Sequence, residues 1–183
     1  AWAGPAQRPL RLGFIGSFNQ AKGAHVLLEA LVLANGQHSL ETVLYGNPAD
    51  DPEYWQGLEQ MAEALPQVRW GGVFASEQLF EVLASLDVLV VPSLWRENAP
   101  LIVSQAMASG LPLLLSDVGG MADQVVPGVN ALLFPPGDSR TLASHLCRFV
   151  SDPQYLATLV NRGGRPRTIG DYGDQLERIY ALL

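Results

Sequence analysis

The chain alternates short, almost continuously apolar runs with longer segments of helical period. Most of the apolar runs lack alternating polar positions, as expected of strands that are buried on both faces of a parallel sheet. Six runs predict strands, at Arg11–Ile15, Thr42–Tyr45, Val68–Trp70, Val88–Val91, Leu113–Ser116 and Ala131–Phe134. Helices are predicted at about Ala24–Ala34, Glu53–Ala64, Glu77–Leu86, Pro100–Ser109 and Thr141–Val150. Repeated β-α units of this length favour right-handed crossovers and therefore a doubly wound, three-layer α/β fold.

Several predicted helix ends carry local signals. Ser76 precedes its helix and is predicted to cap it, and Pro52 stands near a helix start, where a missing amide costs little. Gly110 followed by Pro112 predicts a helix end.

Charge limits the partners of such a domain. Eleven basic and eighteen acidic residues leave a net charge of −7, which argues against nucleic acid and against direct membrane contact by this domain. A phosphate site would therefore be local, built from backbone amides and a few cations. The single cysteine, Cys147, excludes an intramolecular disulfide and fits a reducing, cytoplasmic compartment. No apolar run approaches the roughly 18 residues of a membrane span.

The loop after the first strand, from Gly16 to Gly23, is a candidate phosphate site. In doubly wound sheets, ligands bind beyond the carboxyl ends of the strands, which selects the loops after Ile15, Tyr45, Trp70, Val91 and Ser116. Gly16 permits a tight turn, and Gly23 would let a ligand approach the backbone. Lys22 stands at a helix N-terminus, where amides already favour an anion. The spacing fits neither a Walker loop nor GxGxxG, and a surface lysine beside a glycine turn remains the alternative.

The loop after Val91 is the richest in polar groups. Pro100 opens an apolar helix whose free amides, at Leu101 and Ile102, form a second anion site. Glu97 precedes that helix and would project into the same cleft. Gln105 follows Leu101 by one turn, so it is expected at the cleft mouth. The alternative is that Ser104 and Gln105 both mark the solvent edge of the helix.

Two glycine pairs give weaker signals. Gly119-Gly120 would bring backbone close to an occupant of the cleft, although such pairs also occur for steric reasons. Gly71-Gly72 and the following Val73-Phe74 could hold a flat base through backbone groups, or form an ordinary turn.

Together these segments resemble the C-terminal domain of retaining glycosyltransferases of the GT-B fold, the group 1 family related to glycogen and sucrose synthases. The resemblance runs from about Leu10 to Pro153. Three stretches carry it: GFIGSFNQAKGAHVLLEAL, VRWGGVFASEQLFEVLASLDVLVVPS and LWRENAPLIVSQAMASGLPLLLSDVGGMADQVVPGVNALLFPPGD. It implies that the doubly wound domain is Rossmann-like, with a parallel sheet of about six strands, and forms one half of a GT-B fold.

The resemblance also implies roles for matching positions. Lys22 matches the lysine that binds the donor's diphosphate, in the loop that begins Gly16-Ser17. The amides of Leu101 and Ile102 match those that hold the phosphates, and Glu97 matches the first glutamate of E-x7-E, close to the donor sugar. Gly72 and Val73 fall where the nucleobase is held.

Two positions depart from the family pattern. The second glutamate of E-x7-E, which binds the ribose hydroxyls, is Gln105 here, so the charge is lost while hydrogen bonding is kept. The arginine often found after the first glycine is Ser17, which removes one cation from the diphosphate site.

The implied reaction transfers a hexose from a nucleoside diphosphate sugar to an acceptor hydroxyl with retention. Lys22 and the helix amides would stabilise the leaving phosphate, and Glu97 would accept hydrogen bonds from the sugar. No cofactor is expected. No metal is expected either, because there is no D-x-D motif and no Cys/His cluster; His25, His38 and His145 are scattered.

The resemblance implies three parts for the chain. Residues 1–9 would be a linker from an N-terminal acceptor domain, 10–160 the nucleotide-sugar-binding domain, and 161–183 a linker and helix that return to the N-terminal domain. Without that domain, this chain alone is expected to bind donor weakly and to transfer nothing.

Three other readings stay open. A nucleotide-sugar epimerase of the same architecture would need acid/base groups beyond Glu97 and Asp117. A degenerate nucleotide-binding or scaffolding module is suggested by Ser17 and Gln105. A flavodoxin- or response-regulator-like domain lacks the acidic cluster expected after the first strand.

Overall fold

The computed structural model describes residues 8–34, 39–159 and 169–180. Six parallel strands form one sheet in the order β3-β2-β1-β4-β5-β6. Their bounds are β1 Leu10–Ile15, β2 Leu40–Tyr45, β3 Val68–Gly72, β4 Val88–Val91, β5 Leu113–Ser116 and β6 Ala131–Phe134. All six predicted strands are confirmed, and so is the doubly wound fold.

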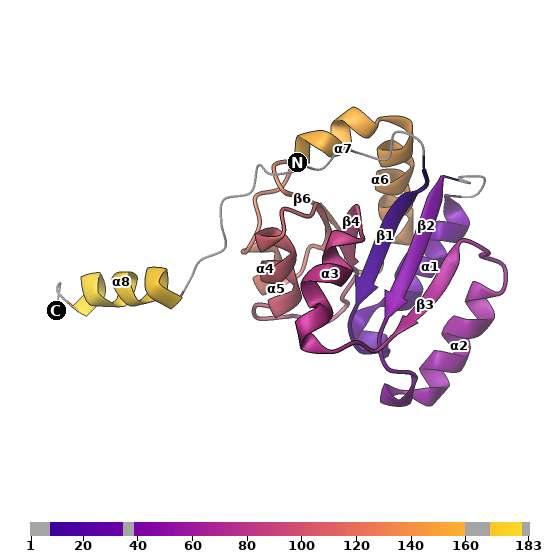
Figure 1. Ribbon diagram of the computed structural model, residues 1–183, viewed down its shortest axis with the longest axis horizontal. Coiled ribbons are helices and arrows are strands. Elements are labelled where there is room, and N and C mark those ends of the chain that lie inside the picture. Colours follow the sequence, from indigo (N-terminus) through magenta and orange to yellow (C-terminus); the bar gives the residue numbers. More distant parts are fainter. Residues whose placement is uncertain (1–7, 35–38, 160–168, 181–183) are drawn as a thin grey trace.

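Helices cover both faces of the sheet (Figure 1). Alternate residues of β4 show the two layers, because Val88 and Val90 belong to one apolar cluster and Leu89 and Val91 to the other. The first cluster includes α1 Ala24–Leu33, α2 Pro52–Ala62, α6 Ser139–Ser151 and α7 Pro153–Leu159. The second includes α3 Leu79–Ala84, α4 Leu101–Ala108 and α5 Gly119–Ala122.

Helix ends follow the local signals with one exception. Asp51 caps α2, with Pro52 in the first turn, and Gly110 leaves α4 in the left-handed conformation at φ 70°. The predicted cap at Ser76 is wrong. Ser76 is the first residue of a 3-10 turn, Ser76–Gln78, and the side chain of Gln78 accepts the backbone N–H of Ala75 at 3.0 Å.

Two helices were not predicted. α5 has only four residues and begins with two glycines, and α7 begins at a proline one residue after α6 ends. The last helix, α8 Ile169–Tyr180, lies away from the sheet in Figure 1. The predicted linkers fall largely outside the described residues. Among the described residues, no helix is long and apolar enough to cross a membrane.

The strand order fixes where a ligand site forms. The chain leaves β1 toward β2 on one side and, through β3 and α3, returns to β4 on the other side of β1. The loops after β1 and β4 therefore diverge to opposite faces, which leaves a crevice at the carboxyl edge of the sheet.

Candidate functional site

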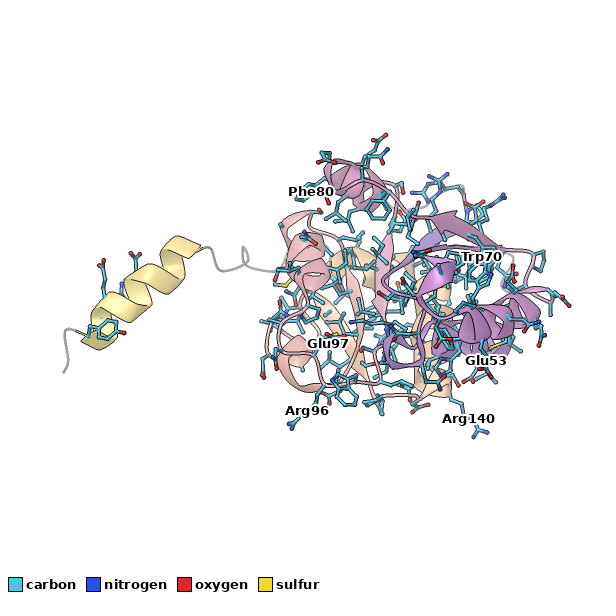
Figure 2. All side chains as sticks on the ribbon, turned by 90° about the horizontal axis from the view of Figure 1, so that it is seen from below. Glu53, Trp70, Phe80, Arg96, Glu97 and Arg140 are labelled. Atoms are coloured by element: carbon cyan, nitrogen blue, oxygen red, sulfur yellow. The ribbon has the colours of Figure 1, made fainter. Side chains whose placement is uncertain are left out.

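A cleft of about 540 Å³ opens at that crevice. It lies where the loops after β1 and β4 meet the start of α4. Its lining includes Gly16, Ser17, Lys22, Glu97, Leu101, Ile102 and Gln105, together with Phe74, Ser76 and Leu79. Eight of the candidate site residues, Phe74 among them, are therefore brought together. In Figure 2, Glu97 lies near the centre of the domain, with Phe80 and Arg96 toward its rim.

The loop after β1 presents Lys22 in a short 3-10 turn, Gln20–Lys22. The side chain of Asn19 accepts the backbone N–H of Lys22 at 3.2 Å and so caps the turn. Gly23 then adopts φ 70°, which favours glycine. A Cβ on Gly23 would lie 2.0 Å from the carbonyl oxygen of Pro92. The close approach predicted at Gly23 is thus made by the loop after β4, not by a ligand.

Hydrogen bonds join these two loops directly. The backbone N–H of Leu94 donates to the carbonyl of Ala21 at 2.8 Å. Phe18 fixes the same loop to the core. It is 1% exposed, and its ring contacts those of Trp55 and Trp70 at centroid distances of 5.1 and 5.8 Å. The position of Lys22 is therefore set by backbone contacts and by a buried aromatic ring.

Lys22 and Glu97 form an ion pair across the cleft. Their side chains are 36% and 18% exposed. The hydroxyl of Ser93, which is fully buried, lies 3.2 Å from the same carboxylate oxygen of Glu97 and 3.1 Å from the carbonyl of Ala21. A hydroxyl has one proton to donate, so Ser93 can donate to Glu97 or to Ala21 but not to both. Ser93 was not among the predicted site residues, although it stands two residues after a strand end.

The first turn of α4 borders the same cleft. Pro100 is the N-cap residue in extended conformation, and the amides of Leu101 and Ile102 have no acceptor within the helix. Gln105 lines the cleft, whereas Ser104 points elsewhere and donates to the side chain of Gln124 at 2.7 Å. The two polar residues of α4 therefore differ, because only Gln105 lines the cleft.

The glycine pair that begins α5 supports the Glu97 segment. The N–H of Gly120 donates to the carbonyl of Glu97 at 2.9 Å. A Cβ on Gly120 would lie 1.4 Å from the carbonyl oxygen of Asn98. The close approach expected at Gly119-Gly120 is again made by protein backbone. It holds Glu97 and Asn98, in the loop that leads to α4, in place.

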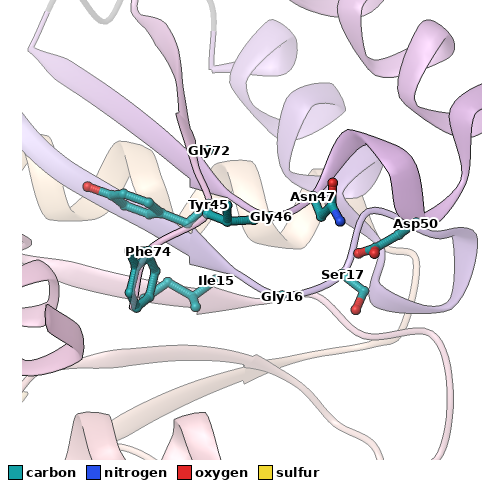
Figure 3. Close-up of a pocket in the computed structure, with 10 residues that line it drawn as sticks. Ile15, Gly16, Ser17, Tyr45, Gly46, Asn47, Asp50, Gly72 and Phe74 are labelled. Atoms are coloured by element: carbon teal, nitrogen blue, oxygen red, sulfur yellow. The ribbon is translucent and has the colours of Figure 1, made fainter. Parts of the chain in front are cut away.

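Gly72 and Val73 lie in a second, smaller cavity of about 260 Å³ (Figure 3). This cavity is also lined by Tyr45, Gly46, Asn47 and Asp50, and it shares Ile15, Gly16, Ser17 and Phe74 with the cleft. Gly72 and Val73 therefore lie in a cavity that adjoins the cleft of Lys22, Glu97 and Gln105, and Phe74 of the same loop lines both. The loop after Tyr45 was among the loops predicted to face a ligand, but none of its side chains was predicted to bind one.

The described histidines lie outside both cavity linings. Burial lowers the pKa of His25 and of His145. Nδ1 of His25 lies 2.7 Å from the hydroxyl of Tyr54, and Nε2 of His145 lies 3.3 Å from the carbonyl of Leu133. Within the described residues, no three His, Cys, Asp or Glu are grouped closely enough to hold a metal ion. His38 is outside the described residues.

Comparison with known proteins agrees with this geometry. A family model described as glycosyl transferases group 1 matches residues 9–152. The D-inositol 3-phosphate glycosyltransferase of Corynebacterium urealyticum is 30% identical over 148 residues, covering 77% of this chain and 35% of that protein. Glycogen synthase of Mycobacterium tuberculosis is 26% identical over 168 residues, covering 92% of this chain and 40% of that protein.

Two solved structures share the fold. Sucrose-phosphate synthase of Thermosynechococcus elongatus has a TM-score of 0.76 at 29% identity, over 98% of this chain and 47% of that one. HepE of Anabaena, solved in complex with UDP and glucose, has a TM-score of 0.82 at 22% identity, over 94% of this chain and 48% of that one. The chain thus spans less than half the length of each of these four proteins.

Proposed function

Because this chain belongs to the group 1 glycosyl transferases, we propose that it is the donor-binding half of an enzyme that transfers a hexose from a nucleoside diphosphate sugar to an acceptor hydroxyl. The observation that carries the proposal is the meeting of three groups in one cleft. These are the ammonium of Lys22, the carboxylate of Glu97 and the free amides at the start of α4. A cation and helix amides suit a diphosphate, and a carboxylate next to them suits sugar hydroxyls.

The remaining residues that line the cleft would bind the nucleoside. Gln105 lies one turn beyond Leu101, so it would hydrogen-bond the ribose while the α4 amides hold the phosphates. Phe74 and Leu79 also line the cleft and would provide an apolar wall for the base. Gly72 and Val73 would then border the base site rather than line it.

In the proposed reaction, the bond between the anomeric carbon and the β-phosphate oxygen breaks. A bond forms from the acceptor oxygen to the same face of that carbon, so the configuration is retained. The acceptor's proton leaves with the nucleoside diphosphate. Negative charge grows on the departing phosphate oxygen, where Lys22 and the amides of Leu101 and Ile102 stabilise it. Glu97 orients the sugar through its hydroxyls, and the charge needed at the phosphate comes from the protein and requires no metal ion.

We expect the acceptor domain to lie in the rest of the protein, because the related proteins are more than twice as long as the segment they share with this chain. The 183-residue chain alone should bind nucleotide and transfer no sugar. The degenerate, non-catalytic alternative rests on Ser17 and Gln105. It predicts that the full-length protein also transfers nothing and that Glu97→Gln changes no activity.

Calorimetric titration of the chain with UDP, GDP and ADP tests the donor site. We expect one nucleotide to bind and Lys22→Ala to weaken it by tenfold or more, because a charge-assisted hydrogen bond contributes about 1.5–3 kcal/mol. Arg140→Ala is the control, since it removes an exposed cation outside the cleft lining. Equal binding by the wild type and Lys22→Ala would refute the site; binding by none, here and in the full-length protein, would refute the function.

A further inference from the structure

Ser93 is a buried serine in the loop after β4, and its hydroxyl lies close to three acceptors. Its Oγ lies 3.1 Å from the carbonyl oxygen of Ala21, 3.2 Å from Oε1 of Glu97 and 3.4 Å from the carbonyl oxygen of Trp95. Because Ser93 is fully buried, solvent does not compete for its single proton. The role of Ser93 therefore depends on which acceptor receives that proton.

Charge favours Glu97 as the acceptor. The distances from Oγ to Ala21 and to Glu97 are nearly equal, but a hydrogen bond to a carboxylate is stronger than one between two neutral groups. The carbonyl of Ala21 also accepts the N–H of Leu94 at 2.8 Å. That bond joins the loops after β1 and β4 without the proton of Ser93.

Glu97 is held at two points that do not involve Lys22. Its main-chain carbonyl accepts the N–H of Gly120 at 2.9 Å, and its Oε1 lies next to the hydroxyl of Ser93. Lys22 contacts the same oxygen, Oε1. Among the described residues, nothing forms a hydrogen bond with Oε2. The carboxylate thus uses one oxygen for the protein and keeps the other for a ligand in the cleft that Glu97 lines.

The proposed reaction separates Lys22 from Glu97, because the diphosphate of the donor attracts the ammonium group. In the described part of the chain, the hydroxyl of Ser93 is then the group that still bonds to the carboxylate. We infer that Ser93 is a positioning residue, which donates to Oε1 of Glu97 and keeps Oε2 available to the hydroxyls of the donor sugar. The inference rests on the proposed function, because it takes Glu97 to bind that sugar.

A purely structural role for the same hydroxyl predicts a different result. If Ser93 donated to Ala21, its loss would loosen the loop that carries Lys22 and would weaken every ligand of the cleft. If Ser93 donates to Glu97, its loss should weaken only ligands that carry the sugar. A nucleoside diphosphate and its sugar derivative therefore distinguish the two roles.

The first test is calorimetry of the 183-residue chain with whichever of UDP, GDP and ADP binds, and with the glucose derivative of the same nucleotide. Ser93→Ala should weaken the binding of the nucleotide glucose about tenfold, as expected for a hydrogen bond to a charged group. It should leave the binding of the nucleotide unchanged. Ser93→Thr keeps the hydroxyl and should restore the affinity for the nucleotide glucose. If a folded Ser93→Thr variant binds as weakly as Ser93→Ala, the inference is wrong.

Ser116→Ala is the matched control. It also removes a fully buried hydroxyl, but one without a hydrogen-bond partner in the part of the chain that the structure describes. We expect it to alter neither affinity.

A double-mutant cycle tests whether Ser93 acts through Glu97. In the Glu97→Gln background, Ser93→Ala should cause a much smaller loss of affinity for the nucleotide glucose than it does in the wild type. An equal loss in both backgrounds would overturn the inference.

A third measurement needs no substitution at Ser93, so it holds even if Ser93→Ala does not fold. The hydroxyl proton of a buried serine exchanges slowly with water, and a charged acceptor moves its NMR resonance downfield. Glu97→Gln should therefore move the resonance of the Ser93 hydroxyl upfield. An unchanged resonance would assign the proton to another acceptor and contradict the inference.

Two further calorimetric results would overturn the role of Ser93 and leave the donor site intact. Equal weakening of the nucleotide and the nucleotide glucose by Ser93→Ala would show that Ser93 holds the loop of Lys22. No weakening of either would show that Glu97 is positioned without it. Failure of every nucleotide to bind both this chain and the full-length protein is a separate outcome, which would remove the proposed function and the role of Ser93 with it.

Discussion

The side chains of Lys22 and Glu97, 75 positions apart in the sequence, pair with each other across the cleft. A diphosphate that binds Lys22 must therefore compete with the carboxylate of Glu97, and a sugar that binds Glu97 must compete with the ammonium of Lys22. A nucleoside diphosphate sugar satisfies both groups at once, whereas a nucleotide alone satisfies only one. We expect this pairing to favour the complete donor over its product.

Glu97→Gln should separate binding from transfer. Removing the carboxylate frees Lys22, so UDP should bind about two- to fivefold more tightly, because an ion pair this exposed is worth up to about 1 kcal/mol. Transfer by the full-length enzyme should fall by tenfold or more, because the sugar loses its charged acceptor. Calorimetry and a radiolabelled transfer assay measure the two effects. A variant that binds UDP more weakly than the wild type would contradict the competition.

Gln105→Glu should restore a charged partner for the ribose. We expect UDP to bind about fivefold more tightly, because a carboxylate accepts hydroxyl hydrogen bonds more strongly than an amide does. Gln105→Ala should weaken the binding of UDP. Neither variant should alter the affinity for 2′,3′-dideoxy-UDP, which has no ribose hydroxyls at these positions. An equal effect on both nucleotides would show that Gln105 acts elsewhere.

Two glycines should prove irreplaceable for steric reasons. Gly23→Ala places a Cβ against the Pro92 carbonyl at a positive φ, and Gly120→Ala places one against the Asn98 carbonyl. Each should lower the free energy of unfolding by about 2–4 kcal/mol, as measured by urea denaturation. Gly57→Ala is the matched control, because nothing lies within 4 Å of its Cβ position in α2. It should stabilise the helix by about 0.5–1 kcal/mol.

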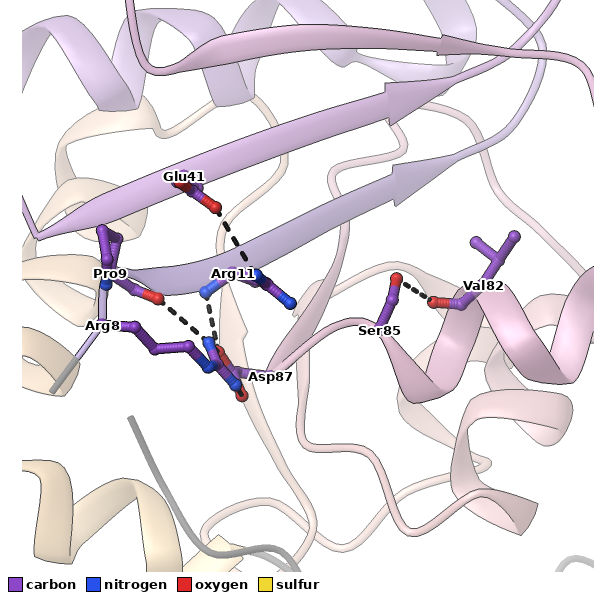
Figure 4. Close-up of polar contacts among 7 residues, drawn as sticks. All are labelled: Arg8, Pro9, Arg11, Glu41, Val82, Ser85 and Asp87. Atoms are coloured by element: carbon purple, nitrogen blue, oxygen red, sulfur yellow. Dashed lines mark hydrogen bonds and ion pairs between the residues drawn. The ribbon is translucent and has the colours of Figure 1, made fainter. Parts of the chain in front are cut away.

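Asp87 should contribute to the stability of the fold and not to nucleotide binding. It is 1% exposed and accepts two hydrogen bonds from Arg8, at 2.6 and 2.8 Å, and one from the N–H of Arg11 at 2.8 Å (Figure 4). Asp87→Asn should cost about 2–3 kcal/mol, with unchanged UDP affinity, because it lies before β4 while the cleft lies after it. Glu41→Gln, which breaks the exposed pair with Arg11 in the same region, should cost less than about 1 kcal/mol.

Two histidines should make the domain less stable as the pH falls below neutrality. Burial holds the pKa of His25 and His145 below the ordinary value of about 6.5. The unfolded chain therefore takes up protons first, and stability is lost as the pH falls through that value toward the lower folded pKa. Melting temperatures at pH 7.5 and 5.5 measure the loss. His25→Asn with His145→Gln keeps each hydrogen bond without a titrating group, and should reduce the difference; an unchanged difference would assign it to other groups.

The sequence predicted what depends on local pattern and on the rule for parallel sheets. Most of the six strands follow from continuous apolar runs, and the placement of Lys22 and Glu97 at one edge follows from their position after strand ends. What it missed depends on contacts between distant residues. Ser93 and Glu97 share the loop after β4, but the hydroxyl of Ser93 also lies 3.1 Å from the carbonyl of Ala21, 72 residues away in the loop after β1.

The wrong predictions also arise from contacts between residues that are distant in the sequence. The glycines at 23 and 120 were expected to make room for a ligand, but each makes room for a carbonyl of a loop about 20 to 70 residues away in the sequence. The second cavity was not predicted because its aromatic side, Tyr45 and Phe74, depends on the ring of Tyr45 lying over Gly71. No periodicity or motif signals a contact between neighbouring strands at their ends.

The geometry of the cleft rests on main-chain contacts: Gly23 against Pro92, Leu94 against Ala21, and Gly120 against Glu97 and Asn98. Side chains that face the ligand contribute little to that framework. A serine at position 17 or a glutamine at position 105 can therefore replace the family's usual residue without refolding the loops. Such a scaffold separates foldability from ligand selectivity, so single substitutions among the cleft-facing side chains can alter the ligand surface while the domain itself stays intact.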